Sequence, residues 1–251
     1  MSAGASKAAG VLALIAVLAA WEVAARLALL NPLLFPPMSK IVGTFAALIA
    51  SGEITGQIAR SMERAALGYF LAAAVFIPLG VAMGLSQRIY RALEVVIETL
   101  RPIPPPVAIP VAMLFLGIGD GMKIFVIFFS CAWPILLNTI DGVKNIDRLL
   151  VDTARTFRLS RAKAIVRVVL PAAAPQIMTG LRISLSITLI LVVISEMVGS
   201  SDGIGYFVLN AQRRLKIDQM YAGMVALALL GYILNQAFLF VCKRVLRGRP
   251  S

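Results

Sequence analysis

The sequence predicts an all-α integral membrane protein with about six transmembrane helices. Of its 251 residues, 60% are hydrophobic and only 14% are charged. Its mean hydropathy of +0.90 exceeds what a soluble core of this length could hide. Several apolar stretches reach or approach the roughly 20 residues that a helix needs to cross the hydrocarbon. We therefore expect a single membrane domain over residues 1–251.

The expected spans follow the apolar stretches in order, because a helix satisfies its own backbone hydrogen bonds in lipid. The first stretch is interpreted as a retained anchor, since its apolar run is too long for an ordinary signal peptide. The third and fourth stretches are short. The six spans are Val11–Leu30, Ala65–Leu85, Ile103–Ile118, Ile124–Ile140, Ile177–Val198 and Met220–Val241.

Two amphipathic helices are expected between the spans. Ile41–Ala50 should rest on the outer surface, and Arg88–Arg101 should lie at the inner interface or pack against its neighbours. RPIPPPVAIP at 101–110 then holds five prolines, which break any helix that enters the membrane. This break is either a gate beside a pathway, with Arg101 and Pro104 as candidates, or a proline-capped helix start.

The net charge of +12 lies mostly in loops on one predicted membrane face. This pattern fits the positive-inside rule better than nucleic-acid binding, and it places both termini in the cytoplasm. Histidine is absent, and Cys131 and Cys242 lack metal-ligand spacing. We expect no structural disulfide, no metal site and no cofactor bound by this chain.

The fifth span carries the polar candidates for a pathway, namely Ser184, Thr188, Ser195 and Glu196. Hydroxyl residues in a membrane helix serve either as packing groups or as ligands of a solute. A carboxylate at this depth costs on the order of 3 kcal/mol unless it is paired or hydrated. Glu196 is therefore either at the outer mouth of a pathway or an interfacial group that reaches water. The loop Ser200–Asp218 beyond it is expected to be an outer gate and docking region.

Residues 151–175, VDTARTFRLSRAKAIVRVVLPAAAP, interrupt the apolar chain with a basic, helix-patterned segment. Two short helices are expected, Val151–Phe157 and Leu159–Val169. Leu170-Pro171, followed by Pro175, should end the pattern before the fifth span. The second helix mixes apolar and cationic groups, which fits docking against a soluble partner or an anionic leaflet.

The order Asp152-Thr153-Ala154, Arg158 and Val168-x-Leu170-Pro171 resembles the cytoplasmic EAA-loop signature of ABC-importer permeases. That signature reads Glu-Ala-Ala, three residues, Gly, nine residues, Ile-x-Leu-Pro. RPIPPPVAIP with FLGIGDG, and GLRISLSITLILVVISEMVGSSDGIGY, resemble the branch that imports nitrate, sulfonates, taurine or bicarbonate. The likeness runs from about Phe35 to the C-terminus.

The resemblance implies a type I importer permease of the bacterial cytoplasmic (inner) membrane. Two permease copies would form the pathway, two separate ATPase subunits would bind ATP and Mg, and an external solute-binding protein would deliver the solute. The EAA-type loop, about residues 143–175, would hold the helix that couples to the ATPase. The implied coupling residues are Asp152, Thr153, Ala154, Phe157, Arg158, Ser160, Leu170 and Pro171.

Two details of this loop stay open at the level of sequence. The glycine of the family pattern is Arg158 here, so either this arginine takes a left-handed conformation, at a cost of roughly 1–2 kcal/mol, or the turn is built differently. Phe157 either anchors the ATPase or packs under its own loop.

Other classes of function are less well supported by the sequence. The chain has no G-x-x-x-x-G-K-[ST] loop, so it is not itself the ATPase. An ion-coupled secondary transporter is the main alternative, and it would usually show internal repeats and buried charged relay groups. A membrane enzyme would need a nucleophile and base arrangement that does not stand out. A homodimer is expected, although a mixed pair of permeases is not excluded.

Overall fold

The computed structural model describes the backbone of residues 3–246, and the side chains of that range apart from residues 3–8, 11, 148, 151 and 155. Every regular element in this part of the chain is a helix, which confirms the predicted all-α class. The helices are α1 (Ala3–Arg26), α2 (Met38–Ala50), α3 (Glu53–Leu85), α4 (Gln87–Leu100), a 3₁₀ turn (Pro105–Val107), α5 (Ala108–Leu116), α6 (Asp120–Lys144), α7 (Arg148–Thr156), α8 (Arg161–Ala164), a π-helical turn (Ile165–Val169), α9 (Leu170–Gly199), α10 (Ile204–Arg213) and α11 (Ile217–Leu246).

Four helical segments in the described part are long and apolar enough to cross a membrane. They are α3, α6, α11 and the continuous segment Arg161–Gly199 that contains α9. They confirm the second, fourth, fifth and sixth predicted spans. The first predicted span, Val11–Leu30, overlaps α1, but α1 ends at Arg26, four residues before the predicted end. Helix α3 begins at Glu53 rather than Ala65, because buried polar residues such as Arg64 are accommodated inside the helix.

The prediction that Ile103–Ile118 spans the membrane by itself is wrong. Its prolines divide it into the 3₁₀ turn and α5, and α5 has only nine residues. Nine helical residues rise about 14 Å, less than half of the roughly 30 Å hydrocarbon core. The α4 segment and the segment Pro105–Leu116 meet at 81°, so together they form at most one broken span. The predicted amphipathic helix Arg88–Arg101 is confirmed as α4, whose Leu93 and Ile97 pack on a small core cluster.

The core lies where α3 and α9 pack on either side of α6. Small residues allow the α3 and α6 backbones to approach closely. A Cβ atom added at Gly68 would lie 2.7 Å from the Cβ of Ile127 and 2.9 Å from the carbonyl oxygen of Ile124. The second contact involves backbone, so a side-chain rotation cannot relieve it.

We expect Gly68→Ala to lower the free energy of unfolding by about 1–3 kcal/mol, the usual effect of overpacking a tight core. Gly56→Ala is the matched control, because Gly56 lies in the same helix with nothing within 4 Å of the added Cβ. Alanine in this open position should stabilise the helix by up to about 1 kcal/mol. Thermal unfolding in detergent would measure both variants. Equal transition temperatures would show that the two helices do not approach as closely as described.

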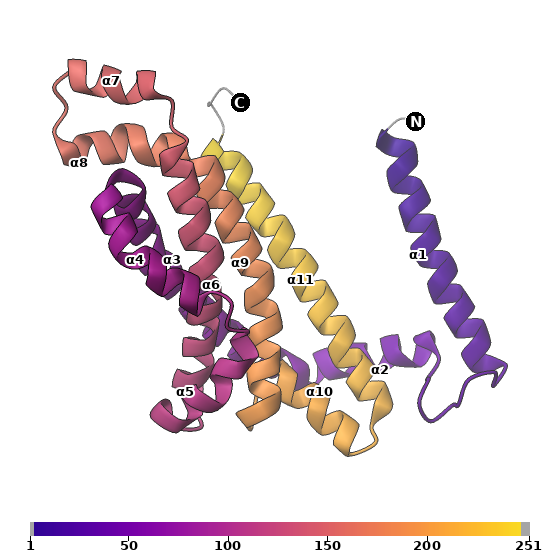
Figure 1. The fold of residues 1–251 in the computed structure, drawn as a ribbon. Helices are drawn as coiled ribbons and strands as arrows, with labels where there is room; N and C mark the ends of the chain where they lie inside the picture. Colours follow the sequence, from indigo (N-terminus) through magenta and orange to yellow (C-terminus); the bar gives the residue numbers. More distant parts are fainter. Residues whose placement is uncertain (1–2, 247–251) are drawn as a thin grey trace.

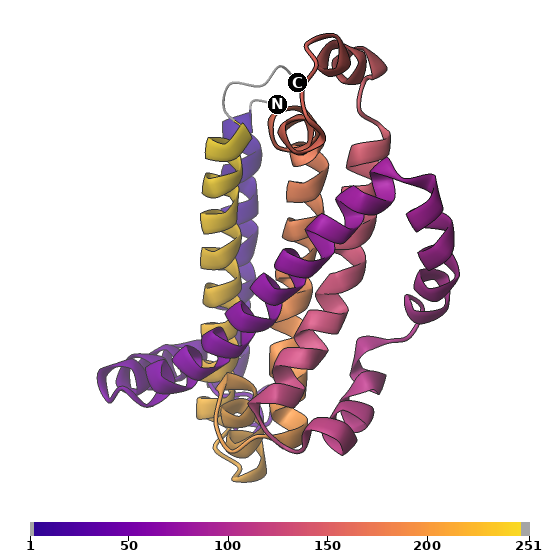
Figure 2. The same cartoon turned by 90° about the vertical axis from the view of Figure 1, so that its left-hand side faces the viewer.

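The two ends of the bundle differ in construction (Figures 1 and 2). Helices α7 and α8 lie stacked at one end, where α1 begins and α11 ends. Helices α2, α5 and α10 gather at the opposite end. The predicted arrangement, with the basic loop on the same side as both ends of the chain, is consistent with these described helices. The termini themselves, residues 1–2 and 247–251, lie outside the described residues.

Candidate functional site

The α7–α8 hairpin, residues 148–169, is a folded element that projects from one end of the bundle (Figure 1). Both predicted short helices are present, as α7 and as α8 with the π-helical turn. Ser160 caps α8, because its hydroxyl accepts a hydrogen bond from the backbone N–H of Lys163 at 3.5 Å. The hairpin therefore contains the predicted coupling residues Asp152, Thr153, Ala154, Phe157, Arg158 and Ser160.

The turn between α7 and α8 answers the question raised by Arg158. This arginine has a φ of +50°, so it adopts the left-handed conformation that the family pattern assigns to glycine. The N–H of Phe157 donates to the carbonyl of Thr153 at 3.0 Å, and the N–H of Leu159 donates to that of Ala154 at 3.2 Å. These bonds close the end of α7 around a left-handed residue, as commonly happens at helix C-termini.

Substitutions at Arg158 should show how strongly this turn depends on a residue that tolerates a positive φ. Arg158→Val places a β-branched residue at positive φ and should destabilise the turn by about 1–2 kcal/mol. Arg158→Gly should keep or increase local stability, because glycine adopts this conformation without a Cβ clash. Amide hydrogen exchange at Phe157 and Leu159 would measure the difference. Faster exchange in the glycine variant than in the valine variant would contradict the assignment.

The predicted helix stop at Leu170-Pro171 is wrong. The chain continues as one helical segment from Arg161 to Gly199. Pro171 directly follows the π-helical turn, and such a turn is a common place for a helix to accommodate an interruption of its hydrogen-bond ladder. Figure 1 shows α8 lying across the end of the bundle while α9 runs along it. The hairpin is thus joined to a membrane helix through helical backbone, not through a break.

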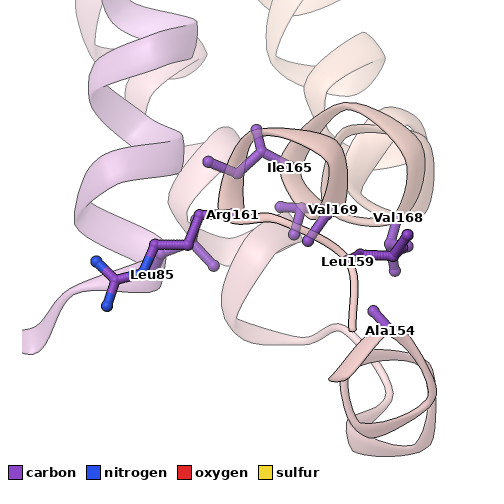
Figure 3. A pocket seen from close by; sticks show the side chains of 8 residues that line it. Leu85, Ala154, Leu159, Arg161, Ile165, Val168 and Val169 are labelled. Atoms are coloured by element: carbon purple, nitrogen blue, oxygen red, sulfur yellow. The ribbon is translucent and has the colours of Figure 1, made fainter. Parts of the chain in front are cut away.

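A groove of about 540 Å³ lies between the hairpin and the end of α3 (Figure 3). Ala154 and Val169 are nearly buried beside it, at 7% and 6% exposure. Phe157 does not line the groove, and its side chain is 74% exposed. Of the two alternatives for Phe157, packing under its own loop is not seen among the described residues. The groove is lined by Leu85, Ala154, Leu159, Arg161, Ala164, Ile165, Val168 and Val169.

A second polar site, the Arg64 cluster, lies at the opposite end of the bundle. It consists of Arg64, Asp120, Lys123, Glu196 and Asp202, which come from α3, α6, α9 and the loop before α10. The Arg64 Nη1 atom lies 2.7 Å from Glu196 Oε1, and Nε lies 2.7 Å from Asp120 Oδ1. Nη2 donates to Asp202, and this hydrogen bond lowers the pKa of the Asp202 carboxyl.

Glu196 is enclosed rather than placed at an open mouth. It is 1% exposed and accepts hydrogen bonds from the Ser61 hydroxyl at 2.8 Å and from the Gly205 N–H at 3.0 Å. Gly203 has a φ of +100°, and a Cβ there would lie 2.2 Å from the Glu196 carboxyl carbon. The paired environment explains how a carboxylate is tolerated at this position.

The other pathway candidates are not gathered into one site. The Ser184 hydroxyl donates to the carbonyl of Cys131 at 3.2 Å, and Thr188 contacts the Cys131 sulfur at 3.0 Å, so both lie in the α6–α9 interface. Ser195 donates to its own helix at Val192. Arg101 and Pro104 are exposed at the break between α4 and α5. Within the single chain, the hydroxyls act as packing groups.

Sequence reasoning missed Arg182. This arginine lies within the predicted fifth span and is exposed on α9. The available signal is a charge among apolar residues at membrane depth, which the distribution of charge among the loops does not reveal.

The chain matches the family described as the inner membrane component of binding-protein-dependent transport systems over residues 74–248, more than half of its length. It is 32% identical to a Bacillus subtilis protein assigned as the aliphatic sulfonates transport permease SsuC, over 94% of this chain and 85% of SsuC. It is 31% identical to the taurine transport system permease TauC of Escherichia coli, over 87% of this chain and 82% of TauC. It is 35% identical to the nitrate import permease NrtB of Leptolyngbya laminosa, over 75% of this chain and 68% of NrtB.

Solved structures agree on the fold. The inward-facing methionine ABC transporter MetNI matches with a TM-score of 0.66 at 20% identity, over 77% of this chain and 96% of the matched chain. The chain belongs to the family of inner membrane components of binding-protein-dependent transport systems. It is a permease subunit of an ABC importer, as the resemblance implied.

Proposed function

We propose that two copies of this chain form the pathway of an ATP-driven importer for a small anion such as a sulfonate, taurine, nitrate or bicarbonate. The observation that carries the proposal is the α7–α8 hairpin, which holds an exposed Phe157 beside a closed turn and continues into a membrane helix. A large apolar ring in water is unfavourable unless a partner covers it. A separate ATPase dimer, which binds ATP and Mg, is the partner that this family requires.

The proposal includes the orientation of the chain in the membrane and its other partners. The hairpin lies on the cytoplasmic side together with both termini, and residues 1–251 form a single domain in the inner membrane with lipid around it. The opposite end carries α10 and the basic residues Arg213, Arg214 and Lys216. We assign to this end the docking of the solute-binding protein. The substrate class rests on the named solutes of the relatives.

Co-purification tests this function against that of an ion-coupled carrier. The tagged chain, extracted in mild detergent from cells that express the whole transport system, should carry two permease copies and two ATPase copies by native mass spectrometry. In liposomes, solute uptake should require ATP inside the vesicle on the ATPase side and the binding protein on the other side. Uptake by the chain alone, driven by a proton or sodium gradient, would contradict the proposal.

A further inference from the structure

One exposed face of α9 carries a polar stripe, formed by Gln176, Thr179, Arg182 and Ser186. All four residues are exposed, and their spacings of three, three and four residues place them on one side of the helix. The opposite side is buried against the bundle, with Ile177, Gly180, Ser184 and Leu191 among its residues. The stripe therefore faces away from the core of its own chain.

Arg182 lies near mid-depth in the membrane. The carbonyl of its neighbour Leu181 accepts a hydrogen bond from Tyr69 at 3.0 Å, and Tyr69 is the middle residue of α3, Glu53–Leu85. The Ser184 hydroxyl bonds to Cys131, which lies close to the middle of α6. Arg182 is also about 18 Å along α9 from Leu170, at 1.5 Å per residue. The backbone of Arg182 is thus level with the centres of two neighbouring helices.

A cation at this depth cannot face lipid without a large cost, which insertion scales put at about 3 kcal/mol. Arg64 avoids the cost by pairing with three carboxylates. Arg182 makes no hydrogen bond or ion pair with any residue of the described part. The surroundings that stabilise it must therefore be water, a second copy of the chain, or both.

The charge on the stripe has one sign. The only acidic residue of α9 is Glu196, which is buried and paired with Arg64. The stripe itself offers hydroxyl, amide and guanidinium groups, and no carboxylate. A water-filled space lined by this face from two copies would hold two arginines without a counter-charge, and such a space would attract anions.

We infer that Arg182 lines the water-filled pathway and is the residue that makes the pathway selective for anions. The inference rests on the proposed function, and it adds a specificity-determining contact within the permease itself. A guanidinium presents several N–H donors to carboxylate, sulfonate or nitrate oxygens. Gln176 and Ser186 would offer neutral hydrogen bonds on either side of this contact.

Thiol labelling tests whether the polar stripe of α9 is exposed to water and positively charged, and it does not require transport. In the assembled complex, with Cys131 and Cys242 of this chain replaced by alanine, Ser186→Cys should react with water-soluble anionic and cationic methanethiosulfonates. Because Arg182 is one helical turn away, adding Arg182→Gln should lower the ratio of anionic to cationic reaction rates by about tenfold. Ile233→Cys on α11, whose native side chain is 60% exposed, is the lipid-facing control and should react with neither reagent.

Uptake tests the role of Arg182 in import. With ethanesulfonate, taurine, nitrate and bicarbonate as probes, Arg182→Gln should reduce ATP-driven import by the reconstituted complex about tenfold or more, because a hydrogen bond to a charged group is lost. Arg182→Lys should retain most of the import, and Arg91→Gln on the exposed side of α4 should be neutral. Recovery of intact complex by size-exclusion chromatography controls for folding.

The outcomes separate the two proposals. An unreactive Ser186→Cys, a rate ratio that Arg182→Gln leaves unchanged, or equal import by wild type and Arg182→Gln would each overturn the inference and leave the importer intact. Import of none of the four solutes by the wild-type complex would overturn the proposed substrate class, and the inference with it.

Discussion

Replacing Arg64 with methionine is expected to reduce the free energy of unfolding by about 3–5 kcal/mol, the range for breaking a buried ion pair from one side. The arginine is 4% exposed and Glu196 is 1% exposed, so the variant leaves an uncompensated charge in the interior. Asp120 and Asp202 are partly in water, with side-chain exposures of 58% and 40%. Their pairs with Arg64 should contribute little, and most of the loss should come from Glu196.

A matched control lies one helical turn away on α3. Arg60 pairs with Glu63 at 3.4 Å, and both side chains are about 60% exposed, so Arg60→Gln should change stability by less than about 0.5 kcal/mol. The double variant Arg64→Met with Glu196→Met should recover part of the loss, because it removes the stranded charge. Unfolding in detergent, followed by thermal or denaturant titration, measures all three variants. A double variant less stable than Arg64→Met would show that Glu196 is not the source of the cost.

Replacing Phe157 with alanine is expected to weaken binding of the ATPase by about 2 kcal/mol or more, as for a central aromatic anchor at an interface. The permease itself should stay folded, because the ring is 74% exposed and its loss leaves no cavity. The closed turn around Arg158 should also persist, since its hydrogen bonds use backbone groups. Titration of ATPase onto permease held in nanodiscs would report the dissociation constant.

Phe115 provides the control for this experiment. It is the same residue type, is 80% exposed, and lies in α5 at the opposite end of the bundle (Figure 1). Phe115→Ala should bind the ATPase like wild type. If Phe157→Ala and Phe115→Ala bind equally well, Phe157 is not the anchor.

Local patterns were sufficient to predict the four segments that are long and apolar enough to cross the membrane, and the two short helices of the hairpin. The resemblance from Asp152 to Arg158 also raised a left-handed Arg158 as one of two alternatives, and the φ of Arg158 selects it. These features are set by residues that are close together in sequence, so a local sequence pattern is enough to predict them. The family assignment rests on the same local signals.

The misassigned features depend on geometry that counting apolar residues cannot resolve. Ile103–Ile118 is apolar enough for a span, yet its prolines turn the chain by 81°. Pro171 signals a stop in sequence, but the helical backbone continues through it by way of the preceding π-helical turn. Arg64 and Glu196 are 132 positions apart, so their pairing required the fold. The exposure of Arg182 likewise depends on which face of α9 packs against α6.

The central claim is that the α7–α8 hairpin transmits the ATPase cycle to the membrane helices, and ATP hydrolysis in the reconstituted complex tests it most directly. Nucleotide can bias the permease only through contacts that differ between its two states. Solute-loaded binding protein should therefore stimulate hydrolysis by the wild-type and Phe115→Ala complexes, and this stimulation should be lost with Phe157→Ala. The basal rate of the isolated ATPase serves as the reference. Full stimulation with Phe157→Ala, and again with a folded chain that lacks residues 152–160, would contradict the account.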